Sequence, residues 1–445
     1  MTGGPAGGQS PDEDPSFRSA LFEDAGLSRD PDGNLLVGGV AIEAIARAAG
    51  TPSFVYNAEA VRRKYLTLDA ALAGYPHRIL YSVKANGNLA VLRVLQEAGA
   101  GCDIVSGGEL RRALAAGFDP GSIVFSGVGK TREELADACE AGIGQINVES
   151  LEELGTLEAI ATDRSQPVRT GIRVNPSVTV DTHPFIATGT AAAKFGIPAD
   201  QVVETALRIA RQPKLRLTGL AMHLGSQLLD PAPYREAARK LAGLVDQIRT
   251  AGITTLRSLD LGGGLGIRYH REQALEPGQL VAEVGPVLGP LGLDWQVEPG
   301  RYLVGSAGLL LATVLYRKHA GGKDFVVVDA GMSDLVRPSH YLAYHDIVVS
   351  RDRGRPVRRV DVVGPICESG DFLALDRPLP DVEPGDVLAI LGAGAYGFVM
   401  GSRYNARPRP AEVLVDGRTW GVARRRETYA DLMAGEVVQP LEHHD

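Results

Sequence analysis

One lysine stands where a strand of apolar residues would end, a position at which an amine can be held partly out of water. Lys84 follows the run Ile79 to Val83 and precedes the turn-forming segment 85–87, Ala-Asn-Gly. On position alone, Lys84 could equally be a lysine that reaches solvent at a strand end. A desolvated lysine, by contrast, has a lowered pKa and forms Schiff bases with carbonyl compounds. The sequence therefore admits carbonyl chemistry at Lys84.

Three further groups of residues follow other apolar runs. They are His223 in the segment HLGSQ, the triplet Gly262, Gly263 and Gly264, and the segment EPGR from Glu298 to Arg301. Glycines let backbone N–H groups approach a phosphate, although such a triplet can also be a plain turn, and Glu298 and Arg301 could form a salt bridge at a rim. An imidazole against a ring, a phosphate site, a carboxylate for a ring nitrogen and a Schiff-base lysine are together what pyridoxal phosphate requires. The set favours that cofactor.

Eight short apolar runs must position these residues. The runs begin at Arg78, Cys102, Ser122, Gln145, Thr170, Leu217, Ser258 and Leu293. Amphipathic segments separate the runs, and several stop at a glycine such as Gly142, as helices do when the next residue has positive φ. Eight βα units over about 250 residues predict a closed (β/α)8 barrel, a TIM barrel with its functional groups on the loops after the strands. An open, doubly wound sheet is the alternative.

The chain changes character after the barrel. Runs such as FVVVDA and AEVLVDG alternate with Pro and Gly and lack a helical period, which predicts a C-terminal all-β domain of the sandwich or barrel type. We therefore expect an α/β protein with the barrel over residues 50–312 and a flexible tail over residues 1–15. The β domain would combine residues 16–49, including the segment LLVGGVAI, with residues 313–445.

Charge and cysteine content restrict the partners. The chain has 46 basic and 54 acidic residues, a formal charge of −8, which argues against nucleic acid or a membrane surface as partner. Cys102, Cys139 and Cys367 are too widely separated for a zinc site, so no metal is expected. Neither a signal peptide nor an apolar run of the ~20 residues that span a membrane is recognisable, so a cytoplasmic protein with a small-molecule substrate is expected.

Six short segments carry a family resemblance over nearly the whole chain. YSVKAN, HLGSQ, GGGLG, EPGR, CESGD and GAYG, in this order, resemble motifs of the fold-type III pyridoxal-phosphate decarboxylases, which have an alanine racemase-like fold. The resemblance implies that Lys84 carries the cofactor as a Schiff base and that His223 stacks on its ring. Glu298 would keep the pyridine nitrogen protonated, and because racemases of this fold type have an arginine there, decarboxylation is favoured. Around the phosphate would lie Ser226, Gly262, Gly263, Gly264, Gly300, Arg301 and Tyr396.

The resemblance is greatest to those members that convert meso-2,6-diaminopimelate to L-lysine and carbon dioxide, the last step of lysine biosynthesis. It implies that Cys367 is catalytic as a proton donor and that Glu368 binds a distal ammonium. Arg301 and Arg337 could bind a distal carboxylate, with Tyr341 and Tyr396 as further contacts. In this family the cysteine motif reaches the cofactor of a partner subunit, which implies a homodimer with shared active sites. On other grounds, Cys367 could be a small buried hydrophobe and Arg337 a solvated surface residue.

Two positions depart from the family pattern, namely His340 before Tyr341 and Ala193 before the segment KFG. His340 lies beside the expected site for the distal carboxylate and leaves room for a modified substrate. One alternative is therefore a decarboxylase of ornithine, lysine, arginine or a carrier-linked intermediate. A non-catalytic pyridoxal-phosphate protein is a second alternative, which would have no need of Cys367, Glu368, Tyr396 or the whole β domain.

Overall fold

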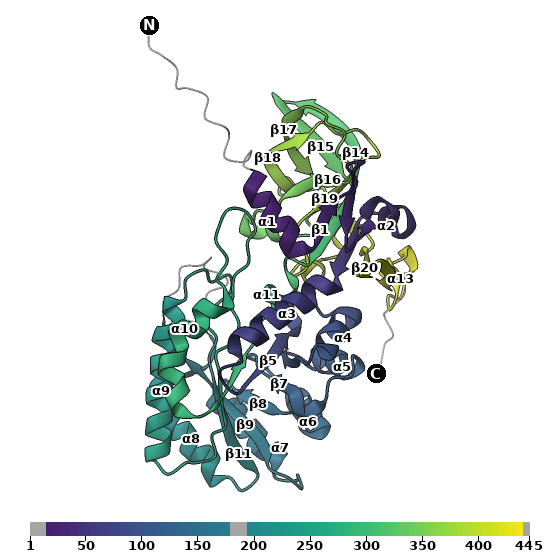
Figure 1. The fold of residues 1–445 in the computed structure, drawn as a ribbon. Helices are drawn as coiled ribbons and strands as arrows, with labels where there is room; N and C mark the ends of the chain where they lie inside the picture. The colour runs from purple at the N-terminus through teal and green to yellow at the C-terminus, as the bar shows by residue number, and fades with distance from the viewer. Residues whose placement is uncertain (1–14, 179–193, 439–445) are drawn as a thin grey trace.

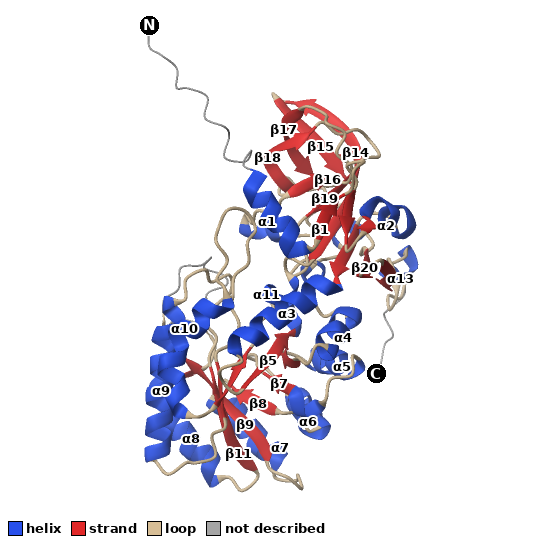
Figure 2. Ribbon diagram, viewed as in Figure 1, coloured by secondary structure: helices blue, strands red, loops and turns tan. Residues whose placement is uncertain are grey.

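The computed structural model describes residues 15–178 and 194–438, which form a barrel and a second, β-rich body that meet near α3 (Ala58–Leu72) and α11 (Arg301–Val304) (Figure 1). Most of the predicted tail and one departure from the family pattern lie outside these limits. Of the tail, only Pro15 is described, and Ala193 lies outside the described residues. Figure 2 shows the two bodies by secondary structure, with helices around the strands of the barrel.

Eight parallel strands close into the barrel. They are β5 (His77–Ser82), β6 (Gly101–Ile104), β7 (Ile123–Phe125), β8 (Gln145–Val148), β9 (Val168–Asn175), β11 (Leu215–Ala221), β12 (Ser258–Asp260) and β13 (Asp294–Val297). The sheet is closed because β13 pairs with β5 and β8 pairs with β9. The predicted (β/α)8 barrel is thereby confirmed against the open sheet, and each predicted run overlaps one of its strands. A two-residue strand, β10 (Ile197–Pro198), adds to β9.

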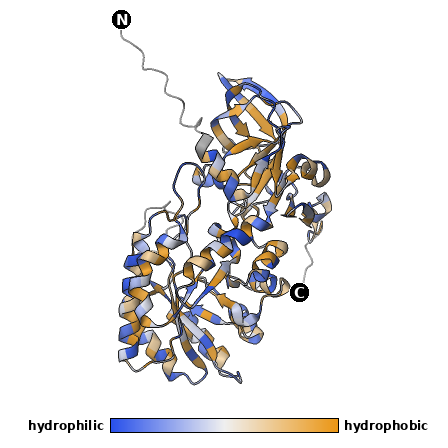
Figure 3. Ribbon diagram, viewed as in Figure 1, coloured by the Kyte–Doolittle hydropathy of each residue, from blue (hydrophilic) through white to orange (hydrophobic). Residues whose placement is uncertain are grey.

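Amphipathic helices cover the outside of the barrel. They are α3, α4 (Leu89–Glu97), α5 (Gly107–Ala115), α6 (Arg132–Ala141), α7 (Leu151–Ala161), α8 (Val202–Arg211), α9 (Ala232–Thr250) and α10 (Pro277–Leu288). Their local sequence sets their ends. In α6, the Thr131 side chain and Glu134 form a reciprocal capping box, and the helix stops at Gly142, which has a φ of +68° as predicted for a left-handed cap. Hydrophobic residues concentrate in the strands of both bodies (Figure 3).

The second body is a nine-stranded sheet, which confirms the predicted all-β region. It contains β4 (Ser53–Asn57), β14 (Gly308–Ala320), β15 (Lys323–Val328), β16 (Ile347–Val349), β17 (Val357–Val363), β18 (Phe372–Pro380), β19 (Val387–Ile390), β20 (Ala411–Asp416) and β21 (Thr419–Arg424). Although β4 lies within the range expected for the barrel, it pairs with β14 and β20 of this sheet. The domain limits at residues 50 and 312 stay a prediction.

The N-terminal elements pack on this second sheet. They are α1 (Pro15–Ala25), β1 (Leu27–Arg29), β2 (Leu35–Val37), β3 (Val40–Ala41) and α2 (Ile42–Ala49). The segment LLVGGVAI does form strands, but β2 and β3 pair with each other across Gly38-Gly39 in a three-stranded sheet of their own. Leu35 and Val37 of this segment share a hydrophobic core with Leu311 of β14 and Val413 of β20.

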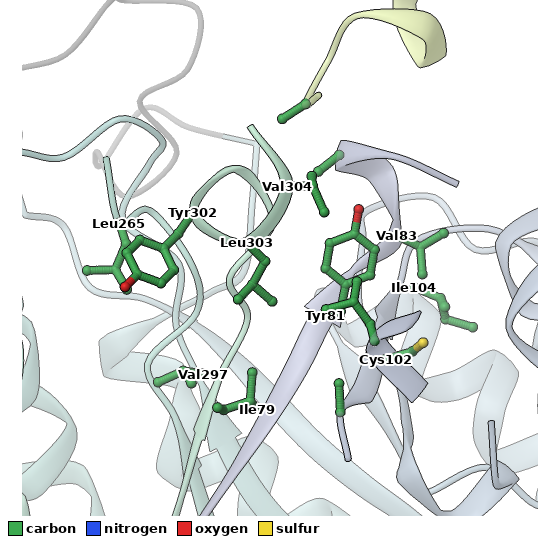
Figure 4. Close-up of a cluster of buried hydrophobic side chains, with 14 of the residues drawn as sticks. Ile79, Tyr81, Val83, Cys102, Ile104, Leu265, Val297, Tyr302, Leu303 and Val304 are labelled. Atoms are coloured by element: carbon green, nitrogen blue, oxygen red, sulfur yellow. The ribbon is translucent and has the colours of Figure 1, made fainter. Parts of the chain in front are cut away.

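A buried cluster supports the ends of the strands that carry the site. Figure 4 shows Ile79 and Tyr81 of β5, Val297 of β13, and Leu303 and Val304 of α11. The cluster includes Val83 and Tyr302, the chain neighbours of Lys84 and Arg301, and so packs the two backbone segments that carry these residues into one core. Among the described helices, none has the length and apolar composition needed to cross a bilayer.

Two leucines on opposite faces of α3 test the packing of the barrel. Leu68 is 0% exposed and Leu66 is 59% exposed. Leu68→Ala should lower the free energy of unfolding by about 2–5 kcal/mol because it leaves a cavity in the core. Leu66→Ala, the matched control, should change the free energy by no more than about 0.5 kcal/mol. Urea unfolding followed by circular dichroism measures both values, and equal effects would contradict the burial described here.

Candidate active site

Lys84 lies in a 3-10 turn, Val83–Ala85, directly after β5. Its Nζ donates to Oδ2 of Asp103 at 3.1 Å, and the Ser82 hydroxyl donates to the same oxygen at 2.9 Å. Burial favours a lower pKa for Lys84, but the charges of Asp103 and Glu298 outweigh it and raise the pKa above its ordinary value. The lowered pKa expected for a desolvated lysine is therefore wrong for this structure, since the carboxylates stabilise the ammonium.

Three buried carboxyl groups form one wall of the site. Asp103 is the penultimate residue of β6, Asp260 ends β12, and Glu298 directly follows β13. Burial and the neighbouring charge of Asp103 raise the pKa of both Asp260 and Glu298 above their ordinary values. Oδ1 of Asp103 and Oδ2 of Asp260 are buried without a hydrogen-bond partner among the described residues. The wall can therefore retain a proton and can stabilise a positive charge placed against it.

His223 is held as a neutral imidazole. The backbone N–H of Gly263 donates to its Nδ1 at 3.0 Å, so this nitrogen carries no proton. Burial and the positive charges of Lys84 and Arg173 lower the pKa of His223 well below its ordinary value. A neutral ring is suited to stacking on another aromatic ring.

The glycines that were predicted to surround the phosphate pack tightly against neighbouring loops at the ends of the barrel strands. A Cβ at Gly263 would collide with the carbonyl oxygen of Glu298. A Cβ at Gly300 would lie 3.0 Å from the Cβ of Ala85, beside the lysine turn. Glycine at both positions thus brings the backbone of the Gly262–Gly264 loop and of the α11 N-terminus close to the site.

Arg301 connects the barrel to the second body. It begins α11, is 7% exposed, and donates through Nη2 to the Ser226 hydroxyl at 2.9 Å and through Nη1 to the Tyr269 hydroxyl at 2.7 Å. Its guanidinium carbon lies 4.8 Å from the ring centre of Tyr396. The backbone N–H of Tyr396 in turn donates to the carbonyl of Ala85 at 2.8 Å, next to Lys84. A guanidinium and a hydroxyl together are suited to binding an anion.

Arg337 begins α12 (Arg337–Tyr341) and is 6% exposed, so its interpretation as a solvated surface residue is wrong. Its Nη1 donates to Nε2 of His345 at 2.9 Å. Its guanidinium carbon lies 4.5 Å from the ring centre of Tyr269. The two arginines that were expected to bind substrate therefore both contact Tyr269.

A cavity of about 660 Å³ is lined by residues of both the barrel and the second body. Seven of the predicted site residues line it, namely Lys84, His223, Ser226, Arg301, Arg337, Tyr341 and Tyr396. The sequence did not single out other lining residues, including Arg173, Phe195, Gln227, Tyr269, Glu272 and Tyr344. Arg173 is the one charged residue within the predicted strand TGIRVN, so a charge inside an otherwise apolar run could have identified it. Tyr269 and Tyr344 lie in irregular segments and carry no comparable signal.

Cys367 and Glu368 do not line this cavity. They lie between β17 and β18, where Cys367 is exposed and its backbone N–H donates to Oδ1 of Asn405 at 2.8 Å. Glu368 accepts a hydrogen bond from the Tyr404 hydroxyl, which raises the pKa of that phenol. The alternative of a small buried hydrophobe is therefore wrong for Cys367 in this chain.

His340, one of the two departures from the family pattern, lies outside the cavity. His340 is exposed, lies edge-on to Tyr341 with the ring centres 4.5 Å apart, and does not line the cavity. In residues 15–178 and 194–438, no group of three His, Cys, Asp or Glu side chains could hold a metal ion.

Comparisons with known proteins identify the family of this chain. The pyridoxal binding domain of pyridoxal-dependent decarboxylases matches residues 58–305. The diaminopimelate decarboxylase of Pseudomonas aeruginosa is 48% identical over 92% of this chain and 98% of its own length. Among solved structures, the enzyme of that name from Helicobacter pylori complexed with L-lysine is 40% identical with a TM-score of 0.85, over 88% of this chain and 98% of that chain. The corresponding L-lysine complex from M. jannaschii is 35% identical with a TM-score of 0.88, over 93% and 98%. The chain therefore belongs to the diaminopimelate decarboxylase family of pyridoxal-phosphate-dependent decarboxylases.

Proposed function

We propose that this protein decarboxylates meso-2,6-diaminopimelate to L-lysine and carbon dioxide, the last step of lysine biosynthesis. The observation that carries the proposal is one cavity with Lys84 and two buried arginines, Arg301 and Arg337, on its walls. The names of the most similar relatives and the L-lysine in two solved relatives support the same substrate. The exposure of His340 outside the cavity gives no support to a larger, modified substrate.

The residues fit pyridoxal phosphate. When bound, this cofactor supplies an electron sink for the electron pair that remains after carbon dioxide leaves. Lys84 would bind it covalently, the neutral His223 would lie against its ring, and Glu298 with its buried acidic neighbours would stabilise a protonated ring nitrogen. The phosphate would be bound by Ser226 and Arg301 with the backbone around Gly262, Gly263, Gly264, Gly300 and Tyr396.

Other polar groups of the chain would bind the distal end of the substrate and accept a proton from Lys84. Arg337, with Tyr341 beside it, would bind the distal carboxylate by charge-assisted hydrogen bonds. Because Lys84 is stabilised as an ammonium by Asp103, it must lose a proton before it can react with a carbonyl. The acidic wall that holds Asp103 provides acceptors for that proton.

We also propose a homodimer in which Cys367 and Glu368 complete the partner's cavity. Neither residue lines the cavity of its own chain, and Cys367 is an exposed free thiol. A protein with three free cysteines is suited to the reducing cytoplasm, which we propose as its location.

The first test is carbon dioxide release with added pyridoxal phosphate, in parallel on meso-diaminopimelate, L-lysine, L-ornithine and L-arginine. Release is expected from meso-diaminopimelate alone, because only this substrate offers a distal carboxylate to Arg337. Release from the other three at comparable rates would contradict the proposed role of Arg337.

Replacing Lys84 tests the cofactor site. Lys84→Ala should abolish both the visible absorbance of the lysine-bound cofactor and carbon dioxide release, because no other described lysine lines the cavity. Lys318→Ala, at an exposed position of β14, is the control and should keep both signals. Retention of both signals in Lys84→Ala would refute the assignment.

Shared sites can be tested by mixing two inactive variants. Lys84→Ala and Cys367→Ala should each lose turnover as pure dimers. After subunit exchange, half of the dimers are hybrids and each hybrid has one intact site, so about a quarter of the wild-type rate should return. Light scattering reports the dimer mass as a control. No regain in a mixture that does form hybrids would show that Cys367 acts within its own chain or not at all.

A further inference from the structure

The two arginines of the cavity are buried without an acidic partner. Among the residues that the structure describes, no carboxylate forms an ion pair with Arg301 or Arg337. Their hydrogen-bond acceptors are the hydroxyls of Ser226 and Tyr269 and the imidazole of His345. Arg173 of the same cavity, by contrast, donates to the carboxylate of Glu149 at 2.8 Å. Because burying an uncompensated charge is costly, Arg301 and Arg337 are prepared for anions that come from a ligand.

His345 accepts from Arg337 in one fixed tautomer. Its Nδ1 lies 2.7 Å from the carbonyl oxygen of Leu391, which can only accept, so Nδ1 carries the proton. Nε2 is therefore the acceptor for Nη1 of Arg337 at 2.9 Å. The imidazole is 0% exposed, and burial with the charges of Arg337, Arg301 and Arg377 lowers its pKa well below the ordinary value. The backbone after β19 thus orients the guanidinium through a ring that stays neutral.

Tyr269 contacts both arginines, and its hydroxyl interacts with each guanidinium. Its hydroxyl accepts from Arg301, its ring faces the guanidinium of Arg337, and His345 lies edge-on to it with the ring centres 5.3 Å apart. A carboxylate in place of either neutral acceptor would compensate one of the arginines and remove its attraction for a ligand anion.

We propose that His345 is a positioning residue that fixes Arg337 without neutralising it, and thereby makes the distal end of the cavity selective for a carboxylate. The inference rests on the proposed function, in which the distal group of the substrate is a carboxylate. It assigns to His345 a role in specificity that requires no contact between its ring and the substrate.

The test uses pimelate, a dicarboxylate of the same chain length as diaminopimelate but without amines to react. Its affinity for the cofactor-loaded protein is measured by calorimetry, with hexanoate as the monocarboxylate probe. Wild type should bind pimelate more tightly than hexanoate. His345→Leu should weaken pimelate binding about tenfold, because Arg337 loses the imidazole that orients its guanidinium. His345→Glu should weaken it at least as much, whereas His345→Gln, which keeps an acceptor near Nε2, should restore most of the affinity.

The controls separate positioning from folding. His319→Leu, at an exposed position of β14, should leave pimelate affinity unchanged, and all variants should keep the visible absorbance of the bound cofactor. Wild-type pimelate affinity in His345→Leu or His345→Glu would overturn the proposal, as would loss of the cofactor signal in His345→Gln. Pimelate binding and turnover of meso-diaminopimelate are measured separately. If wild type binds pimelate and His345→Glu does not, the proposal for His345 stands even if meso-diaminopimelate is not turned over. A failure of the proposed function can therefore be told apart from a failure of this proposal.

Discussion

Buried charge of both signs must be balanced at the mouth of the barrel, and the neighbouring structure depends on that balance. Asp103, Asp260 and Glu298 converge from the ends of three strands, and burial together with the charge of Asp103 raises the pKa of Asp260 and that of Glu298. Lys84 compensates part of this charge directly. The arginines Arg301 and Arg337 lie among neutral acceptors instead. The site thus has an acidic side and an uncompensated basic side, a polarity that suits a zwitterionic substrate with additional anionic groups.

The second body holds the basic side in place. The Asn86 side chain donates to the carbonyl of Gly394 at 3.0 Å, and the backbone N–H of Tyr396 donates to the carbonyl of Ala85. These two hydrogen bonds attach a loop of the β sheet to the turn that carries Lys84. On the opposite side, α1 contacts both bodies. Phe17 lies edge-on to His270 of the barrel, and Arg18 forms an ion pair with the buried Asp346 at 2.8 Å. These contacts fix the separation between the arginines of α11 and α12.

The sequence indicated those features that depend on a single segment. Each barrel strand is a short apolar run, and Lys84 and His223 end or follow such runs, so their places could be predicted. Asp103 and Asp260 come close to Lys84 only when the barrel closes. Because the raised pKa of Lys84 depends on such carboxylates, its direction could not be predicted from the segment around Lys84 alone. His345 acts through a carbonyl 46 residues away, and the pairing of β2 with β3 outside the main sheet depends on a local turn. Whether Cys367 completes a site depends on a second chain.

The position of β4 has a consequence for how the protein is made. This strand is synthesised early, but its neighbours β14 and β20 follow the whole barrel in the chain. A chain emerging from the ribosome can therefore form the barrel while both edges of β4 still lack their hydrogen-bonding partners. Unpaired strand edges are templates for association with other chains. Premature termination before β20 would leave such an edge permanently open, so the C-terminal strands protect the N-terminal part of the protein from aggregation.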